Sequence, residues 1–246
     1  MHLLENTARA VTLSSWGVSR QGDVYKENQD SFLNWPDRMF WSVADGVGST
    51  AHGAEASKAV TRAFLSLGVP DSLDFFVEEA RAKIAECNNS LYNQLTVAGS
   101  AASTVVALLM HGSQAACLWA GDSRCYLLRN DVLYQCTHDH TLRQHMIDRK
   151  ELTAPEAYRM IKGNVITNAI GGQAELQLDE VRFALQAGDR FLLCSDGLGN
   201  LLNPAALQQY MSRGTPRECC DAISAAFHGR RMEDNVTFIA VFISWT

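Results

Sequence analysis

Three aspartates stand at the edges of apolar runs that have the composition of β-strands. Asp45 and Asp196 each follow such a run and precede a glycine, whereas Asp234 leads into one. If the third strand is antiparallel to the other two, all three carboxylates arrive at the same end of a sheet. Hard divalent cations such as Mg²⁺ or Mn²⁺ prefer carboxylate and carbonyl oxygens, and an aspartate followed by glycine offers both. The pattern predicts a metal-dependent hydrolase.

A fourth aspartate, Asp122, lies between two further strand-like runs. A single Asp-Gly after a strand is more often a turn than a metal site, because both residues tolerate turn conformations. Four strand-edge aspartates favour a shared site, although periodicity alone does not show that they converge. For Asp122 two interpretations stay open: a metal ligand, or a turn residue paired with Arg124.

Composition limits the classes of function. The 246 residues are 47% hydrophobic, enough to bury the core of one domain, and we expect residues 1–246 to form a single domain. A net charge of −6 without a basic run excludes a nucleic-acid partner held by its phosphates, and it disfavours a two-metal nuclease. A protein substrate fits better, and we expect a monomer.

Seven cysteines without paired C-x-x-C spacing predict reduced thiols and a cytoplasmic protein. The first fifteen residues lack the apolar core of a signal peptide, and no later run is apolar enough to span a bilayer. We therefore expect no membrane association.

The elements that must position the aspartates follow from residue type and periodicity. Nine runs rich in β-branched and aromatic residues predict strands at 12–18, 39–44, 103–110, 115–120, 125–128, 132–136, 178–184, 190–194 and 236–243. Helical spacing predicts helices at 53–67, 72–95, 141–161, 204–211 and 216–227. The short links between several strands are typical of hairpins. An α+β sandwich with mostly antiparallel sheets accounts for this order.

Eight ordered motifs give the chain a close resemblance to the metal-dependent Ser/Thr protein phosphatases of the type 2C (PPM) family, from Gly22 to Ala240. They are Glu27-Asn28-Gln29-Asp30, Val43-Ala44-Asp45-Gly46-Val47-Gly48, Ser103-Thr104, Ala120-Gly121-Asp122-Ser123-Arg124-Cys125-Tyr126, Thr137-His138-Asp139-His140, Asn168-Ala169-Ile170-Gly171, Leu193-Cys194-Ser195-Asp196-Gly197-Leu198 and Asp234-Asn235-Val236-Thr237. The resemblance implies a four-layer α-β-β-α sandwich, in which two mostly antiparallel sheets are flanked by helix pairs and metal ions bind in a cleft at one end.

The resemblance also implies a role for each acid. Asp45 is expected to bridge two ions, Mn²⁺ or Mg²⁺, and Gly46 to offer its carbonyl to one of them. Asp196 and Asp234 are expected to complete the ligands of the other ion. The implied reaction is hydrolysis of phosphoserine and phosphothreonine by a hydroxide that bridges the metals, without a covalent enzyme intermediate.

Two further acids are assigned by the same resemblance. Asp30 is expected to act with Asp45 in catalysis by orienting metal-bound water. Asp122 is expected to help hold a more weakly bound third ion together with Asp196.

Several positions depart from the family pattern. Tyr25 stands where many members have an arginine that binds the substrate phosphate; Lys26 and Arg20 are nearby substitutes, although a surface lysine is usually only solvated. Gln29 replaces a common glutamate, and Val47 stands where eukaryotic members have a histidine general acid. Phosphate capture and proton donation are therefore the least determined parts of the predicted site.

The charged segment 141–167 corresponds to a flap beside the cleft in bacterial members, which makes it the candidate for substrate selection. The bacterial pattern implies a phosphatase that opposes a Ser/Thr kinase. Within that group the chain is similar to phosphatases associated with type VI secretion, which implies a forkhead-associated partner protein and its cognate kinase.

A second class of function stays open: a catalytically weak, phosphoprotein-binding regulatory module with the same fold. Tyr25 and Gln29 favour this alternative. The intact set of Asp45, Asp196 and Asp234 argues for an enzyme.

Overall fold

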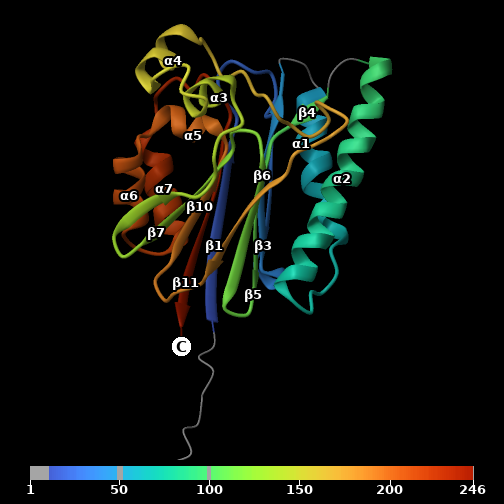
Figure 1. The fold of residues 1–246 in the computed structure, drawn as a ribbon. Coiled ribbons are helices and arrows are strands. Elements are labelled where there is room, and N and C mark those ends of the chain that lie inside the picture. Colours follow the sequence, from blue (N-terminus) through green and yellow to red (C-terminus); the bar gives the residue numbers. More distant parts are fainter. Residues whose placement is uncertain (1–10, 49–51, 99–100, 246) are drawn as a thin grey trace, which may run out of the picture.

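Four layers of secondary structure are stacked on one another in the computed structural model, which describes residues 11–48, 52–98 and 101–245. Helices α1 (His52–Ala63) and α2 (Leu73–Ala98) cover one sheet, and helices α6 (Pro204–Met211) and α7 (Pro216–Ala226) cover the other (Figure 1). The expected four-layer α-β-β-α sandwich is confirmed. Residues 1–10, in which we expect no signal peptide, lie outside the described residues.

The two sheets are antiparallel throughout. In the first, the strand order is β2 (Asp30–Trp35), β3 (Phe40–Val47), β5 (Val105–His111), β6 (Gln114–Ala120) and β9 (Asp179–Ala184), and the short β4 (Ala102–Ser103) also pairs with β3. In the second, the order is β1 (Val11–Arg20), β11 (Val236–Trp245), β10 (Arg190–Cys194), β7 (Arg124–Arg129) and β8 (Val132–Gln135).

Strand β3 shows why the central strands read as continuous apolar runs. Side chains alternate between the two faces of a strand, so Phe40 and Ala44 face α1 and α2, while Trp41 and Val43 face the second sheet. Both faces are buried, and the strand therefore carries apolar residues at nearly every position. The core consequently lies in three slabs, one between the sheets and one beneath each helix pair.

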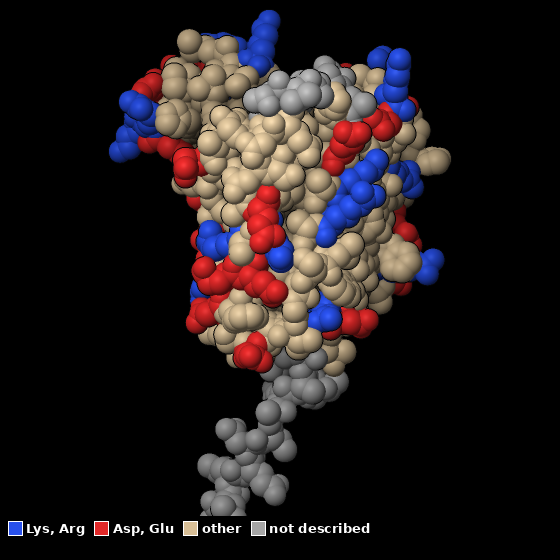
Figure 2. Space-filling model, turned by 90° about the vertical axis from the view of Figure 1, so that its right-hand side faces the viewer, with Lys and Arg blue, Asp and Glu red and all other residues tan. Residues whose placement is uncertain are grey.

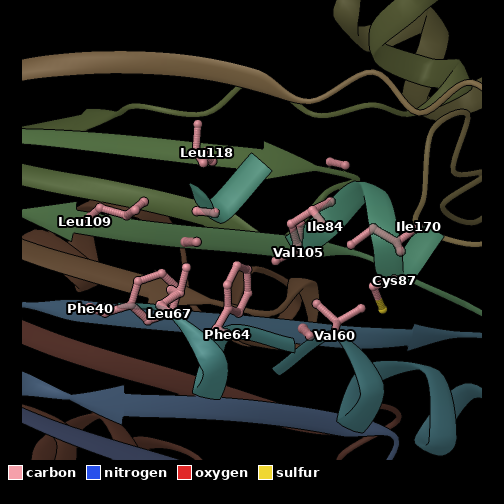
Figure 3. Packing of buried hydrophobic residues seen from close by; sticks show 14 of the residues in the cluster. Phe40, Val60, Phe64, Leu67, Ile84, Cys87, Val105, Leu109, Leu118 and Ile170 are labelled. Atoms are coloured by element: carbon pink, nitrogen blue, oxygen red, sulfur yellow. The ribbon is translucent and has the colours of Figure 1, made fainter. Parts of the chain in front are cut away.

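The slab beneath α1 and α2 is built around aromatic rings. Phe40 and Phe64 are fully buried with their ring centroids 4.6 Å apart, and Val60 and Ile84 close the space between the helices and the sheet (Figure 3). On the outer face of these helices acidic and basic side chains are interspersed, with no extended basic surface among the described residues in this view (Figure 2). No described helix is long and apolar enough to cross a bilayer.

Three elements differ from the sequence-based expectation. Strand β2 was not predicted, because Asp30-Ser31-Phe32-Leu33-Asn34-Trp35 at the sheet edge mixes polar and apolar residues without a clear alternation. The predicted helix 141–161 is wrong as one element. It is two helices, α3 (Leu142–Asp148) and α4 (Ala154–Met160), because Lys150 has a positive φ and Thr153 begins a new helix with a capping box to Glu156.

The third difference concerns the residues after β10. The sequence suggests a tight turn at Asp196-Gly197, but these residues begin a short helix, α5 (Asp196–Leu201). Ser195 precedes that helix in an extended conformation at its N-cap. The helix N-terminus therefore lies directly at the end of the strand.

The aromatic packing beneath α1 predicts a large stability effect. Phe64→Ala should lower the free energy of unfolding by about 3–5 kcal/mol, because a fully buried ring is removed and a cavity remains. Urea denaturation measures this. Phe75→Ala is the matched control, because Phe75 is 52% exposed on α2, and its effect should stay within about 0.5 kcal/mol. Equal effects of the two variants would contradict the packing described.

Candidate active site

A cleft of about 860 Å³ lies at one end of the sandwich, and its lining includes four aspartates, Asp45, Asp122, Asp196 and Asp234, together with Glu233. The expectation that the first three lie at the end of one sheet is wrong. Asp45 lies in β3 of the first sheet, whereas Asp196 follows β10 and Asp234 precedes β11 in the second. Strands β10 and β11 are antiparallel, as expected, so their acids share one edge. The cleft is therefore built where the two sheets face each other.

Asp30 connects the two sheets beneath the cleft. It lies directly opposite Asp45 in the pairing of β2 with β3. Its Oδ2 accepts a hydrogen bond from Ser195 Oγ at 2.9 Å, and Ser195 Oγ accepts one from the Thr237 backbone N–H at 3.1 Å. The other oxygen, Oδ1, is buried and has no hydrogen-bond partner among the described residues. Asp30 is thus fixed by the second sheet while one of its oxygens remains available.

The backbone of Asp45 is held by a hydroxyl cluster. Its N–H donates to Thr104 Oγ1 at 3.0 Å, and its carbonyl accepts from Thr104 N–H at 2.8 Å and Ser103 Oγ at 3.0 Å. Thr104 Oγ1 also hydrogen-bonds Ser123 Oγ at 2.7 Å. The Ser103-Thr104 motif therefore fixes the position of Asp45 without using the Asp45 carboxylate.

Glycine allows close backbone contacts beside two of the acids. A Cβ on Gly46 would lie 2.2 Å from the Gly53 carbonyl oxygen at the start of α1. A Cβ on Gly197 would lie 2.1 Å from the Asn235 carbonyl oxygen. Neither separation is tolerated between real atoms, so both positions need a residue without a side chain.

Asp122 is buried between these loops, with 2% of its surface exposed. Neither of its carboxylate oxygens has a hydrogen-bond partner in the part of the chain that the structure describes. The pairing with Arg124 is not formed, because Arg124 donates to Asp139 from Nε at 2.9 Å and from Nη2 at 2.5 Å. The interpretation of Asp122 as a turn residue satisfied by Arg124 is therefore wrong.

The carboxylates raise one another's pKa values. Burial, followed by the charges of Asp30 and Asp196, raises the pKa of Asp45 well above its usual value. Burial and the charge of Asp196 raise the pKa of Asp122 to about 7 and that of Asp234 to about 6. For Asp30 burial is the main cause of a pKa of about 6. The protein concentrates negative charge here, where a positive charge would relieve the repulsion.

The donor set fits a hard divalent cation. It offers carboxylate oxygens, two of them on Asp122 buried without partners, and the backbone carbonyl of Gly46 beside them. Among the described residues no three Asp, Glu, His or Cys side chains converge closely enough to form a ready-made ion site. Of these acids, Asp196 is already engaged, because its Oδ2 accepts from Asn164 Nδ2 at 2.7 Å.

Asn164 belongs to the segment 141–167, which lies over the cleft with α3 and α4 at the top of Figure 1. Arg143 holds this segment together. Its guanidinium donates to Asn164 Oδ1 and to the carbonyls of Ile161 and Gly163, at 3.0 to 3.2 Å, and stacks 4.3 Å from the ring centroid of Tyr158. The Arg143 guanidinium therefore stabilises the segment itself, although its charge could otherwise bind a substrate.

The positions that depart from the family pattern also line the cleft, namely Tyr25, Gln29 and Val47. The negative charge of Asp234 raises the pKa of the Tyr25 hydroxyl, which therefore keeps its proton. Lys26 is not among the lining residues, whereas Arg231 is. Sequence reasoning missed Arg231, although it stands three residues before Asp234 in an Arg-Arg pair.

A family model described as "Protein phosphatase 2C" matches residues 23–225. The chain belongs to the protein phosphatase 2C family. The resemblance drawn from the eight motifs is thereby confirmed, as is the prediction of an enzyme, since this is a family of metal-dependent protein phosphatases.

Individual members of the 2C family resemble the chain over most of its length. The Serine/threonine phosphatase stp of Listeria innocua is 29% identical, with 90% of this chain and 92% of the relative covered. PppA, described as a key regulatory component of T6SS in Pseudomonas aeruginosa, is 32% identical with a TM-score of 0.85, covering 95% of this chain and 98% of that one. The catalytic domain of PstP, solved with two manganese ions, is 26% identical with a TM-score of 0.84, covering 96% and 100%.

The carboxylate repulsion predicts an unusual pH dependence for the chelator-treated protein. The folded state raises the pKa of Asp122 from 3.8 to about 7, so it retains a proton that the unfolded chain releases. The contribution of this group to the free energy of unfolding therefore falls as pH rises through that window. Asp122→Asn removes this contribution, so its stability should fall less steeply than that of the wild type between pH 4 and pH 7, as measured by urea denaturation. Parallel curves would show that Asp122 is not in a repulsive environment.

Proposed function

We propose that this phosphatase hydrolyses phosphoserine and phosphothreonine in proteins, using Mn²⁺ or Mg²⁺ held by the carboxylate cluster. The observation that carries the proposal is the convergence of four aspartates on one cleft, with Asp122 buried and both of its oxygens unsatisfied among the described residues. A catalytic site that keeps such charges together needs cations to offset their repulsion. The names of relatives such as the Listeria phosphatase support the Ser/Thr specificity.

The residues that would hold the ions follow from their places in the cleft. Asp45, which lines the cleft from the first sheet, would bridge two ions, with the Gly46 carbonyl on one of them and Asp196 and Asp234 on the other. Asp122 is suited to a third ion shared with Asp196. When bound, such ions neutralise the substrate phosphate and activate water as the nucleophile.

The chain's own residues supply the remaining functions. Asp30, fixed by Ser195 and with a free buried oxygen, orients groups beside Asp45. Arg231 and the protonated Tyr25 hydroxyl line the cleft and can bind phosphate oxygens in place of the arginine that Tyr25 replaces. Ser195 is fully buried and donates to Asp30, so it is not a nucleophile.

Replacing Asp45 tests the metal centre in two ways. Asp45→Asn should lower kcat for p-nitrophenyl phosphate with Mn²⁺ by at least about a hundredfold, because loss of an ion removes several kcal/mol of charge stabilisation. In the presence of chelator the same variant should melt at a higher temperature than the wild type, since one buried like charge is gone. Added Mn²⁺ should raise the melting temperature of the wild type but not that of the variant.

Asp37→Asn is the matched control, because it removes an acid from the short helix Pro36–Arg38 outside the cleft. Unchanged Mn²⁺ binding by Asp45→Asn in a calorimetric titration would refute the bridging role. Mn²⁺ binding by the wild type without any metal-dependent turnover would favour the catalytically weak, phosphoprotein-binding module instead.

A cellular role follows from the similarity to PppA. We propose that the chain opposes a bacterial Ser/Thr kinase in the control of type VI secretion, with a phosphorylated forkhead-associated protein as its substrate. The 32% identity and the near-complete coverage of both chains support this assignment.

The assignment predicts a specific change in the phosphoproteome. Deleting the gene should raise threonine phosphorylation on a forkhead-associated protein, and restoring the wild type but not Asp45→Asn should reverse the change. Quantitative phosphoproteomics measures it. Accumulation of phosphorylation only on proteins unrelated to secretion would contradict the role.

A further inference from the structure

A second hollow, of about 560 Å³, adjoins the carboxylate cleft. It is lined by three arginines, Arg20, Arg230 and Arg231, together with Asp23, Phe227 and His228. Arg231 and Met232 line both the hollow and the cleft. The two spaces are therefore neighbours that share this part of their walls, although they differ in charge.

The arginines of the hollow are not engaged elsewhere. All three are exposed, and within the described part of the chain none has a side-chain hydrogen bond or an ion pair. The guanidinium of Arg20 lies over the Phe227 ring, 5.7 Å from its centroid, a contact that uses the face of the guanidinium and none of its N–H donors. Three unpaired positive charges thus gather on a chain whose net charge is −6.

The one acid in the hollow is already used by the backbone. Asp23 Oδ2 accepts from the Met232 N–H at 2.7 Å, and the Asp23 N–H donates to the Met232 carbonyl at 2.8 Å. Gly22 N–H donates to Asn235 Oδ1 at 3.1 Å. These bonds tie the end of β1 to the loop that leads into Asp234. The wall of the hollow is consequently fixed relative to the cleft.

We propose that this hollow is a subsite for a second anionic group of the phosphoprotein substrate, a carboxylate or another phosphate close in sequence to the residue being dephosphorylated. The inference rests on the proposed function, because it places the scissile phosphate over the carboxylate cluster. From there a bound peptide can continue past Arg231 and Met232 into the hollow. Guanidinium groups bind carboxylate and phosphate oxygens with paired N–H donors, which suits both forms of the anion.

The subsite lets the enzyme select phosphoprotein substrates by their charge, without a deep apolar pocket. The hollow is positive, so a substrate gains from an acidic group placed there and loses from a basic one. The arginines are exposed, and their attraction for an anion weakens as salt screens it. The preference should therefore decline with ionic strength.

Phosphothreonine peptides test the subsite directly. A neutral peptide is compared with peptides that carry one aspartate, one second phosphothreonine or one lysine at each neighbouring position in turn. For at least one position on one side of the scissile residue, the acidic peptides should show kcat/KM raised by about tenfold over the neutral one, mainly through KM. The lysine peptide should be the poorest substrate. The aspartate and phosphate arms distinguish the two forms of the anion.

The double variant Arg20→Gln/Arg230→Gln should bring the acidic-to-neutral ratio of kcat/KM close to one, while Arg230→Lys should keep most of it. Arg231 is left intact because it also lines the cleft. The matched control is Arg217→Gln, which removes an arginine that lies over Trp16, 4.8 Å from the ring centroid, near the start of α7. The hollow lies beyond the other end of that helix, so the control should keep the full ratio.

Two controls separate this proposal from the proposed function. If the wild type hydrolyses p-nitrophenyl phosphate with Mn²⁺ but treats acidic and neutral peptides alike at every position, the subsite is overturned and the function stands. If the wild type hydrolyses nothing, the proposed function fails. Fluorescence-anisotropy titration then decides on the subsite alone: tighter binding of acidic peptides that is lost in the double variant supports it, and equal binding overturns it.

Discussion

Repulsion between crowded carboxylates, withdrawn in part from solvent, is the constraint on which the site depends. Asp45, Asp122 and Asp234 each have a raised pKa because burial and the neighbouring acids oppose their ionisation. Left to themselves such groups would separate or bind protons. Here they come from two sheets whose cores, such as the rings of Phe40 and Phe64, are packed independently of the cleft. The packed sandwich therefore offsets the stability that is lost through repulsion between the acids of the cleft.

Neutral hydroxyl and backbone groups hold the acids in place by hydrogen bonds. Thr104 and Ser103 hold the backbone of Asp45, and Ser195 holds the carboxylate of Asp30 from the opposite sheet. None of these contacts brings a positive side chain to the cluster. Had lysine or arginine paired with the acids, the charge would have been neutralised inside the protein, and the cleft would have little affinity for a cation.

The chemistry was more predictable from the sequence than the geometry. The acids lie in short motifs that are recognised without knowledge of the fold. Asp45, Asp196 and Asp234 could therefore be chosen from the sequence alone. Their origin in two sheets could not, because strand pairing is a long-range property that local periodicity does not contain. Strand β2 and the break between α3 and α4 were missed for a related reason: edge pairing and a single positive φ at Lys150 leave a weak local signal. Arg231 was missed because its role depends on a neighbouring cavity.

Strand β11 has an effect on the order of assembly. It lies between β1 and β10, pairing Val11 with Trp245 at one end and Cys194 with Phe238 near the other, and Asp234 immediately precedes it. Synthesis delivers the N-terminal strands first, so a nascent chain in which β11 has not yet been made has Asp45 but neither Asp234 nor the strand that positions it. Such a chain therefore cannot yet bring the aspartates of the cleft together. The cleft is complete only once β11 has been inserted between β1 and β10.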